Sequence, residues 1–349
     1  METIIAINAQ AERNVTDTRS VPFGKMPTEH MFMAEYRNGA WHNAQVVPFQ
    51  NLTLSPLALC LHYGQTVFEG MKAFRTADGS VNIFRIDKHH QRFNKSLHRM
   101  CMPEVPAELF TQAIRQLVKL DADWVPNDAD GSLYIRPFMI ATEDRIGVKA
   151  SDEYLFMVVC SPAFQYYTQP LRVKVETTYV RAAQGGTGAT KCGGNYGGAL
   201  YPTTLARQAG YDQVLWTDAA HHEFIEESGT MNAMFVIDNL LITPGLSGTI
   251  LDGVTRDSLL ALAEEAGITV QERQISYHEL IRAFEAGKRV EAFGAGTAAV
   301  VAPIETIAIG DKEYKCYTGD DATMYKLQKA LYDIRRGITT DTHNWNTIV

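Results

Sequence analysis

The sequence predicts a two-domain protein of mixed α/β class whose first half is of the α+β type. The chain has 349 residues, and domains usually span about 100–200 residues, so two domains are expected. Strand-like runs and helical patterns occur in both halves, and a short aromatic stretch that ends in proline, Ala163–Pro170, lies between them. We therefore expect a small domain at residues 1–162, a linker at 163–172 and a large domain at 173–349.

Periodicity of apolar residues indicates the individual elements. The run Tyr154–Ser161 is apolar enough for a buried strand, and Pro106 suits the start of a helix. In the first half we expect strands at Met31–Tyr36, Ala44–Pro48, Val81–Arg85, Leu133–Thr142 and Tyr154–Ser161, and helices at His89–Met100 and Ala107–Leu120. In the second half we expect strands at Leu171–Tyr179, Gln213–Thr217, Met234–Ile237 and Leu240–Thr243, and helices at Gly198–Gln208, Ser258–Ala266 and His278–Gly287.

Composition excludes several classes of protein. Hydrophobic residues make up 46% and charged residues 21%, which is ordinary for a globular protein with a sizeable core. The net charge of −8 argues against a general nucleic-acid binder, which needs a basic face. No segment reaches the roughly 18 apolar residues of a membrane span. Residues Met1–Arg13 lack the basic region and long apolar stretch of a signal peptide.

Cysteine usage points in the same direction. The five cysteines are widely spaced and form no CxxC pair, so neither a disulfide framework nor a metal site is predicted. Scattered free thiols fit a reducing compartment. We expect a soluble cytoplasmic protein with no metal and with no nucleic-acid or membrane partner. The cysteines are Cys60, Cys101, Cys160, Cys192 and Cys316.

The segment Gly185–Gly198, GGTGATKCGGNYGG, contains seven glycines and one lysine, Lys191. Glycines let the backbone approach a ligand closely, and a desolvated lysine amine becomes a nucleophile able to form a Schiff base. Asn195 and Tyr196 can hydrogen-bond a phenolic oxygen next to an aldehyde. The alternative is a flexible loop with a solvated lysine, in which Asn195 makes a turn and Tyr196 packs. The GGTG run lacks the spacing of a dinucleotide fingerprint.

A second segment, Phe224–Asn232 (FIEESGTMN), contains two adjacent carboxylates. A carboxylate that faces a pyridine nitrogen keeps the ring protonated and able to accept electrons. Because Glu226 and Glu227 would point to opposite faces of an extended strand, only one is expected to point inward. Thr230 can donate to an anion or a substrate carboxylate. The alternative for the glutamates is a solvated edge.

Two Gly-Thr segments, Leu251–Ser258 (LDGVTRDS) and Phe293–Ala299 (FGAGTAA), offer backbone N–H groups and a hydroxyl. We expect a loop to enter a helix at each, which is the arrangement that binds phosphate. An ordinary helix cap is the alternative. Arg92, in the basic helical run HHQR, can supply the cation that a phosphate needs, or it can lie on the surface.

Taken together and in this order, these segments resemble the branched-chain aminotransferase family, in the fold-type-IV group of pyridoxal-phosphate enzymes to which D-amino-acid aminotransferases also belong. The resemblance runs from Val21 to about Val349, and the long form found in bacteria and animals matches better. The motifs are LHYGQTVFEGMKAF (Leu61–Phe74), LYIRPFMIATED (Leu133–Asp144), GGTGATKCGGNYGGAL, EESGTMN and EAFGAGTAAVVAP (Glu291–Pro303).

The resemblance implies that pyridoxal 5′-phosphate is the cofactor. Lys191 is then the Schiff-base lysine and the proton shuttle, and Tyr196 bonds the phenolic oxygen. Glu227, rather than Glu226, faces the pyridine nitrogen, because it precedes Asn232 by five residues as in the family motif. Further cofactor-binding residues implied by the resemblance are Arg92 at the phosphate, with Thr230, Val254, Thr255 and Thr297.

The resemblance also implies the substrate side. Phe23, Phe68 and Tyr134 form apolar walls, while Arg136 and Tyr63 are candidates for a polar end. Tyr63 and Thr230 lie near the substrate carboxylate, with the backbone amides of Thr297 and Ala298. Ile146 and Val148 belong to a loop that reaches the neighbouring subunit's pocket, so a homodimer is expected.

The implied reaction is transamination of L-leucine, L-isoleucine and L-valine with 2-oxoglutarate, giving branched-chain 2-oxo acids and L-glutamate, in biosynthesis or degradation. An apolar wall discriminates by only about 1–3 kcal/mol per methylene, so all three should react.

The rival interpretations are a D-amino-acid aminotransferase, an aminodeoxychorismate lyase, a non-catalytic cofactor-binding protein and, disfavoured by its missing fingerprint, a nucleotide-binding oxidoreductase. Some animal members carry a CxxC pair where this chain has Ala299 and Ala302, so that redox switch should be absent. Cys192 is interpreted as small apolar packing.

Overall fold

The computed structural model describes residues 6–7, 18–19 and 21–349. We expect no signal peptide at Met1–Arg13. Of this stretch, the structure describes only Ala6 and Ile7. Contacts within the chain divide it into two compact units. The first unit comprises Met1–Tyr166, Lys191–Gly194 and Asp333–Val349, and the second comprises Tyr167–Thr190 and Asn195–Tyr332.

These units differ from the expected domains 1–162 and 173–349 in two later segments. Residues Lys191–Gly194 group with the first unit, where Cys192 forms a β-bridge with Val67. The C-terminal segment joins the same unit because strand β18 pairs with β6. The change from the first unit to the second, after Tyr166, falls inside the expected linker 163–172.

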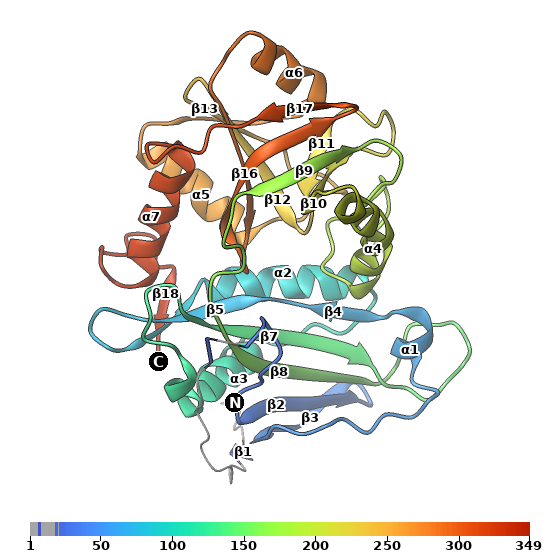
Figure 1. Ribbon diagram of the computed structural model, residues 1–349. Coiled ribbons are helices and arrows are strands. Elements are labelled where there is room, and N and C mark those ends of the chain that lie inside the picture. Colours follow the sequence, from blue (N-terminus) through green and yellow to red (C-terminus); the bar gives the residue numbers. More distant parts are fainter. Residues whose placement is uncertain (1–5, 8–17, 20) are drawn as a thin grey trace. The chain divides into compact units, whose positions relative to one another are not determined.

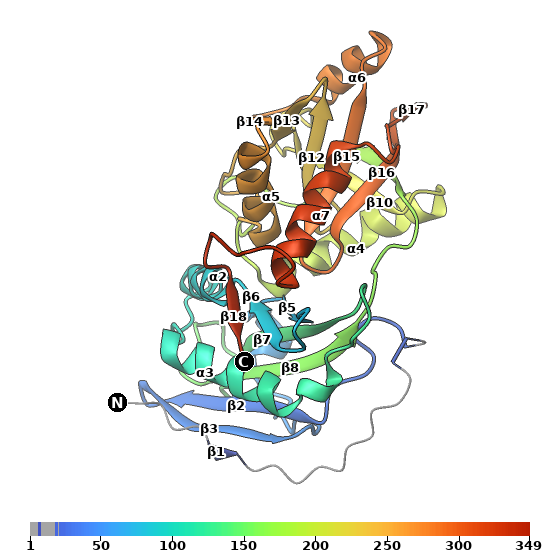
Figure 2. The same cartoon turned by 90° about the vertical axis from the view of Figure 1, so that its left-hand side faces the viewer.

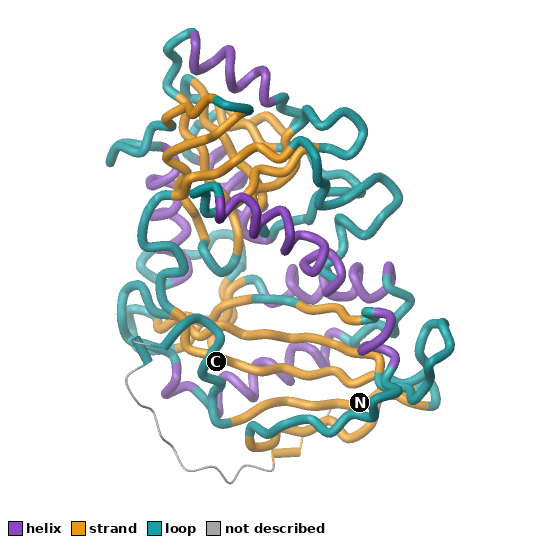
Figure 3. The backbone as a smooth tube through the Cα atoms, turned by 45° about the vertical axis from the view of Figure 1, so that its right-hand side comes forward, coloured by secondary structure: helices purple, strands orange, loops and turns teal. Residues whose placement is uncertain are grey.

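The first unit is built on one mixed sheet of nine described strands in the order β1-β3-β2-β8-β7-β5-β6-β18, with β4 paired to β7 (Figures 1 and 3). Only β1 and β3 pair in parallel among these strands. The strands are β1 Ala6–Ile7, β2 His30–Arg37, β3 Ala40–Pro48, β4 Thr66–Phe68, β5 Met71–Arg75, β6 Val81–Phe84, β7 Ser132–Ala141, β8 Tyr154–Ala163 and β18 Asn346–Ile348. The helices are α1 Leu59–Tyr63, α2 Ile86–Arg99 and α3 Ala107–Leu120, followed by a 3₁₀ turn at Ala122–Trp124.

Aromatic packing holds α2 and α3 on this sheet. Phe93 of α2 and Phe110 of α3 are fully buried against Phe156 of β8, with ring centroids 5.6–6.0 Å apart. The remaining buried residues of α3 recur at helical spacing, as expected of an amphipathic helix. They are Leu109, Ala113, Ile114, Leu117 and Val118.

The second unit contains a sheet that closes on itself. Strand β11 pairs with both β10 and β12, so the order β11-β10-β9-β16-β15-β12 forms a ring, extended by β13, β14 and β17. Helices α4, α5 and α6 lie outside the strands (Figure 2). The strands are β9 Leu171–Glu176, β10 Gln213–Thr217, β11 Ile225–Ser228, β12 Met231–Ile237, β13 Leu240–Thr243, β14 Thr269–Glu272, β15 Val290–Gly296, β16 Val300–Ile309 and β17 Lys312–Lys315. The helices are α4 Gly193–Gln208, α5 Val254–Glu265, α6 Tyr277–Glu285 and α7 Thr323–Arg335, the last of which ends in the first unit.

Most predicted elements are confirmed, and three coincide with observed bounds: α3, β10 and β13. The helix expected at Gly198–Gln208 begins five residues earlier, at Gly193, and contains Pro202. Strands β15 and β16 were not predicted. Most of their residues are buried on both faces of the sheet, so their sequences lack the alternation of apolar and polar residues that indicates a strand. Across the described residues, no helix is both long and apolar enough to cross a membrane.

Lys72 of β5 makes stability depend on pH. Burial, reinforced by the charge of Arg335, lowers its pKa from 10.5 to about 7. Between these two values the unfolded chain binds more protons than the folded one, so the free energy of unfolding rises with pH. Below about pH 7 Lys72 is charged in the folded protein as well, so the full cost of its buried charge lowers the free energy of unfolding there.

We predict that Lys72→Met removes a slope of up to about 1.4 kcal/mol per pH unit between pH 7 and 9. The measurement is urea unfolding of both proteins across this range. Thiols also titrate there, but both proteins contain the same cysteines, so their contribution cancels in the difference between the two slopes. Exposed Lys95 of α2 supplies the control, since Lys95→Met should keep the wild-type slope. Parallel curves for the wild type and Lys72→Met would contradict the prediction.

Candidate active site

Lys191 is held by its own main chain. Its carbonyl oxygen accepts a hydrogen bond from the Phe68 N–H at 3.0 Å, and its N–H donates to Ser96 Oγ at 3.0 Å. The side chain is partly buried, with Nζ 4.7 Å from the centroid of the Phe68 ring. The lysine is therefore fixed by β4 and α2 and does not belong to a flexible solvated loop.

Arg92 is buried in α2 and is not a surface arginine. Its Nε and Nη2 donate to the two oxygens of Glu69 at 2.6 and 2.8 Å, and His89 Nδ1 lies 2.8 Å from Oε2 of the same carboxylate. Burial alone would raise the pKa of Glu69, but the charge of Arg92 and the bonds from Arg92 and His89 outweigh it and hold that pKa well below its usual range. Burial lowers the pKa of His89.

Glu69 and His89 were not among the predicted site residues. One signal for Glu69 was available, because it is the single charged residue in the otherwise apolar run Val67–Met71. A charged residue in such a run is expected to be buried, and a buried carboxylate requires partners. Breaking such a buried pair by removing one member typically costs about 3–5 kcal/mol.

Three predicted substrate residues of the first unit, Phe23, Phe68 and Arg136, gather with Tyr134. The Arg136 guanidinium lies over the rings of Phe68 and Tyr134, at 4.8 and 5.2 Å, and its Nη2 donates to the Tyr134 hydroxyl at 2.9 Å. Phe23 meets the Tyr134 ring edge-on at 4.9 Å. A Cβ at Gly70 would overlap the Tyr134 hydroxyl, so the close approach of this side chain requires glycine.

Tyr63 and the loop that contains Ile146 and Val148 form a separate pair. The Tyr63 hydroxyl donates to the carbonyl oxygen of Ile146. Ile146 and Val148 are 62% and 80% exposed, so both apolar residues lie on the surface of the chain.

A pocket in the second unit contains three of the predicted cofactor residues, Tyr196, Glu227 and Thr230. Val254, Thr255 and Thr297 are not among its lining residues. The pocket also contains Arg181, which sequence reasoning missed, because nothing local distinguishes this arginine from a solvated one. The full lining is Arg181, Gly188, Thr190, Asn195, Tyr196, Ala199, Glu227, Gly229, Thr230 and Leu251.

Both Glu226 and Glu227 are buried, so the alternative of a solvated edge is wrong. They use different partners: Thr249 Oγ1 donates to Glu226 Oε1, whereas the Leu251 N–H donates to Glu227 Oε1 at 2.8 Å. Arg181 Nε lies 3.2 Å from Glu227 Oε2 and forms an ion pair with it. Burial raises the pKa of Glu226. Glu227 is thus the pocket-lining carboxylate that is paired with a cation.

Asn195 is engaged by the glycine-rich segment itself. Its Nδ2 donates to the carbonyl oxygens of Thr187 and Thr190, both at 2.8 Å, and its Oδ1 accepts from Thr187 Oγ1 at 2.7 Å. The side chain therefore stabilises a turn, which was the alternative to a ligand-binding role.

Asn232 brings the second motif and both Gly-Thr segments together. It pairs with Glu227 in the β11–β12 hairpin and with Ala295 of β15, and its Nδ2 donates to the Leu251 carbonyl at 2.9 Å. A Cβ at Gly253 would overlap Asn232 Oδ1, which explains that glycine.

The two Gly-Thr segments differ from each other in structure. Val254 and Thr255 open α5, as expected for a loop that enters a helix. Thr297 and Ala298 instead form the turn between β15 and β16, so the helix expected after FGAGTAA is wrong, since strand pairing continues directly beyond the turn.

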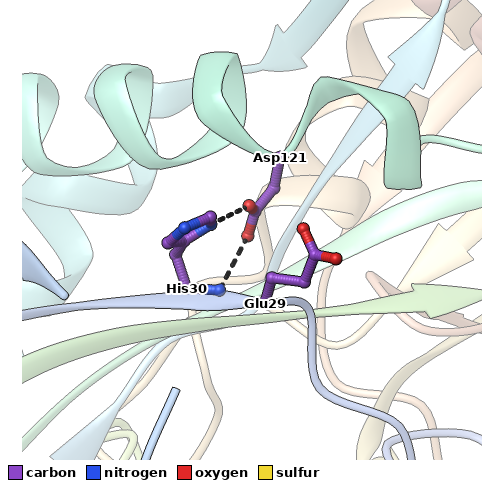
Figure 4. Close-up of side chains that lie close together, drawn as sticks. All are labelled: Glu29, His30 and Asp121. Carbon is purple, nitrogen blue, oxygen red and sulfur yellow. Dashed lines mark hydrogen bonds and ion pairs between the residues drawn. The ribbon is translucent and has the colours of Figure 1, made fainter. Parts of the chain in front are cut away.

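A further cluster of potential metal ligands, Glu29, His30 and Asp121, lies where β2 begins and α3 ends (Figure 4). Asp121 Oδ1 lies 2.6 Å from His30 Nδ1, and its Oδ2 accepts from the His30 N–H at 3.4 Å. Because both carboxylate oxygens face His30, we interpret the cluster as a hydrogen-bonded pair that fastens the end of α3 to β2.

Comparison with known proteins identifies the family. The family model described as "Amino-transferase class IV" matches residues 66–307. The "Branched-chain-amino-acid transaminase 1" of Bacillus subtilis (strain 168) is 45% identical over 345 residues, which cover 95% of both chains. A solved branched-chain amino acid aminotransferase from Escherichia coli has a TM-score of 0.74 and 26% identity, with 92% of this chain and 98% of that chain covered.

A second curated relative, the "Branched-chain-amino-acid aminotransferase" of Mycolicibacterium smegmatis, is 44% identical over 334 residues. The match covers 93% of this chain and 90% of that relative. The family match spans more than half of the chain, and both curated relatives match almost all of it. The chain therefore belongs to the amino-transferase class IV family.

Proposed function

We propose that this protein is a pyridoxal-phosphate-dependent aminotransferase that moves the amino group of L-leucine, L-isoleucine or L-valine to 2-oxoglutarate, giving branched-chain 2-oxo acids and L-glutamate. The observation that carries the proposal is Lys191, a partly buried residue whose main chain is fixed between Phe68 and Ser96 and whose amine lies over the Phe68 ring. The name of the Bacillus subtilis relative, similar along almost the whole chain, supports the substrate class.

The side chains present match what the cofactor requires. A protonated pyridine nitrogen needs an ionised carboxylate, and Glu227 is paired with Arg181 in a pocket. Tyr196 in the same pocket offers a hydroxyl for a phenolate oxygen. A phosphate needs a planar cation and helix N–H groups, which Arg92 and the start of α5 at Val254 and Thr255 can provide. We assign Thr230 and Thr297 to the same ligand.

The chemistry follows from these assignments. Pyridoxal 5′-phosphate, when bound, supplies an aldehyde that condenses with amines and a ring that takes up the electron pair left on the substrate α-carbon. Lys191 Nζ would hold the cofactor at rest and, as a free amine, would take the proton from the substrate α-carbon. Glu227 would keep the positive charge on the ring nitrogen. Tyr196 would orient the ring by a hydrogen bond from its hydroxyl.

The substrate side chain is assigned to the first unit. Phe23, Phe68 and Tyr134 form an aromatic wall for branched aliphatic groups, while Arg136 and Tyr63 provide polar contacts for a second carboxylate. We place the substrate α-carboxylate at Thr230 and at the backbone amides of Thr297 and Ala298. One surface can in this way serve an apolar and an acidic substrate in turn.

We further propose that the protein works as a homodimer in the cytoplasm. The exposed Ile146 and Val148 side chains would be covered by the partner's pocket, and Tyr63 fastens their loop through the carbonyl of Ile146. The five cysteines are free, which agrees with a reducing compartment. The reaction serves the biosynthesis or degradation of branched-chain amino acids.

Replacing Lys191 by alanine should abolish transamination of L-leucine, with a loss of at least about a thousandfold in kcat, because both the amine that binds the cofactor and the base disappear. The assay couples L-leucine and 2-oxoglutarate to glutamate formation. Lys326→Ala, at an exposed lysine of α7, should retain wild-type activity. Near-normal turnover by Lys191→Ala would refute the assignment.

Glu227→Gln and Glu226→Gln form a matched pair at neighbouring buried positions. We expect Glu227→Gln to lower kcat at least about tenfold, because a neutral amide cannot stabilise a charged ring nitrogen. Glu226→Gln should lower kcat much less, since its carboxyl bonds to Thr249 and lies outside the pocket lining. Steady-state kinetics with L-leucine measures both effects. Equal losses, or a greater loss for Glu226→Gln, would contradict the choice of Glu227.

The substrate assignment predicts kcat/KM values for L-leucine, L-isoleucine and L-valine within about 200-fold of one another, because their side chains differ by about one methylene. D-alanine should be a poor donor. Preference for D-alanine would indicate a D-amino-acid aminotransferase, and pyruvate release from aminodeoxychorismate would indicate a lyase. Cofactor absorbance that stays unchanged on addition of L-leucine would indicate a non-catalytic cofactor-binding protein.

A further inference from the structure

We propose that Glu69 is a positioning residue for Arg92, which it aims at the phosphate of the cofactor, and that it thereby sets the preference of this protein for the phosphorylated ligand. This inference rests on the proposed function, in which Arg92 binds that phosphate.

The Glu69 carboxylate is completely buried and makes close contact with four nitrogen atoms. Its Oε1 accepts from Arg92 Nε at 2.6 Å, and its Oε2 accepts from Arg92 Nη2 at 2.8 Å and from the Gly70 N–H at 3.1 Å. His89 Nδ1 lies 2.8 Å from the same Oε2. Two of the contacts are to one guanidinium, so they fix its plane as well as its position.

The backbone around Glu69 is fixed as firmly as its side chain. The Glu69 N–H donates to the Pro137 carbonyl at 2.7 Å, and the preceding residue, Phe68, donates to the carbonyl of Lys191. The strand end that holds the cofactor-binding lysine therefore also carries the carboxylate that orients Arg92.

An arginine side chain has many rotamers, and ordering it when a ligand binds reduces affinity. Because Glu69 orders Arg92 before any ligand binds, the loss of side-chain entropy does not reduce the affinity for the ligand. The alternative is that the ion pair only fastens α2 to the sheet. The two roles differ in one measurable respect: positioning affects ligands that carry the phosphate, whereas fastening affects all ligands alike.

The test titrates the full chain, freed of cofactor, with pyridoxal 5′-phosphate and with pyridoxal, and takes the ratio of the two dissociation constants from absorbance. In Glu69→Gln the single amide oxygen can replace Oε2 with its three contacts, and the amide nitrogen then faces Arg92 Nε. One of the two hydrogen bonds to the guanidinium is therefore lost, while the volume of the side chain is unchanged. We expect the preference for the phosphorylated ligand to fall at least about tenfold, with pyridoxal affinity nearly unchanged.

Asp121→Asn is the matched control, because it neutralises another buried carboxylate that pairs with a histidine in the same unit (Figure 4). It should lower the melting temperature and leave the preference for phosphate unchanged. In the double variant Glu69→Gln with Arg92→Lys, the preference should fall no further than in Arg92→Lys alone, because Glu69 acts through Arg92.

Should Glu69→Gln fail to fold, Glu69→Asp retains the buried charge but shortens the reach by one methylene, and the same fall in preference is expected. The inference is overturned if a folded Glu69 variant keeps the wild-type preference, or if it weakens both ligands equally. If the wild-type chain binds neither ligand, the proposed function fails and this inference fails with it, so the two failures are distinguishable.

Discussion

The position of the Lys191 main chain is the constraint on which the rest of the site depends. A lysine in a segment with seven glycines would otherwise sample many conformations, since glycine gives up more backbone freedom on ordering than any other residue. Bonds to Phe68 and Ser96 overcome that freedom, and the β-bridge from Cys192 to Val67 adds a third attachment. Cys192 itself is buried in the core of the first unit, in keeping with apolar packing.

The same strand residue links the lysine to the aromatic surface. The Phe68 ring lies under the Lys191 amine and also under the Arg136 guanidinium. An aromatic face attracts cations without hydrogen bonds, so Phe68 is in position to hold both groups by its ring alone.

Buried carboxylates recur as the organising charges of both units, and each has specific partners. Glu69 pairs with Arg92, Glu227 with Arg181, and Asp121 with His30. Buried ion pairs contribute little net stability, because desolvation offsets most of the attraction, yet removing one partner costs about 3–5 kcal/mol. That is a large share of the roughly 5–15 kcal/mol by which a domain is stable. Such pairs therefore specify geometry more than they add stability.

The sequence by itself determined the local features of this protein, namely most helices and strands and the order of the motifs, and it singled out Lys191 as the candidate Schiff-base lysine. Each of these depends on residues close together in the chain. Only the tertiary structure decided which distant residues meet. It placed both Glu226 and Glu227 in the interior, buried Arg92 against Glu69, and turned the segment after Phe293 into a hairpin. These outcomes depend on strand pairing and on the desolvation of charges. Both are interactions between segments far apart in sequence, which local periodicity does not encode.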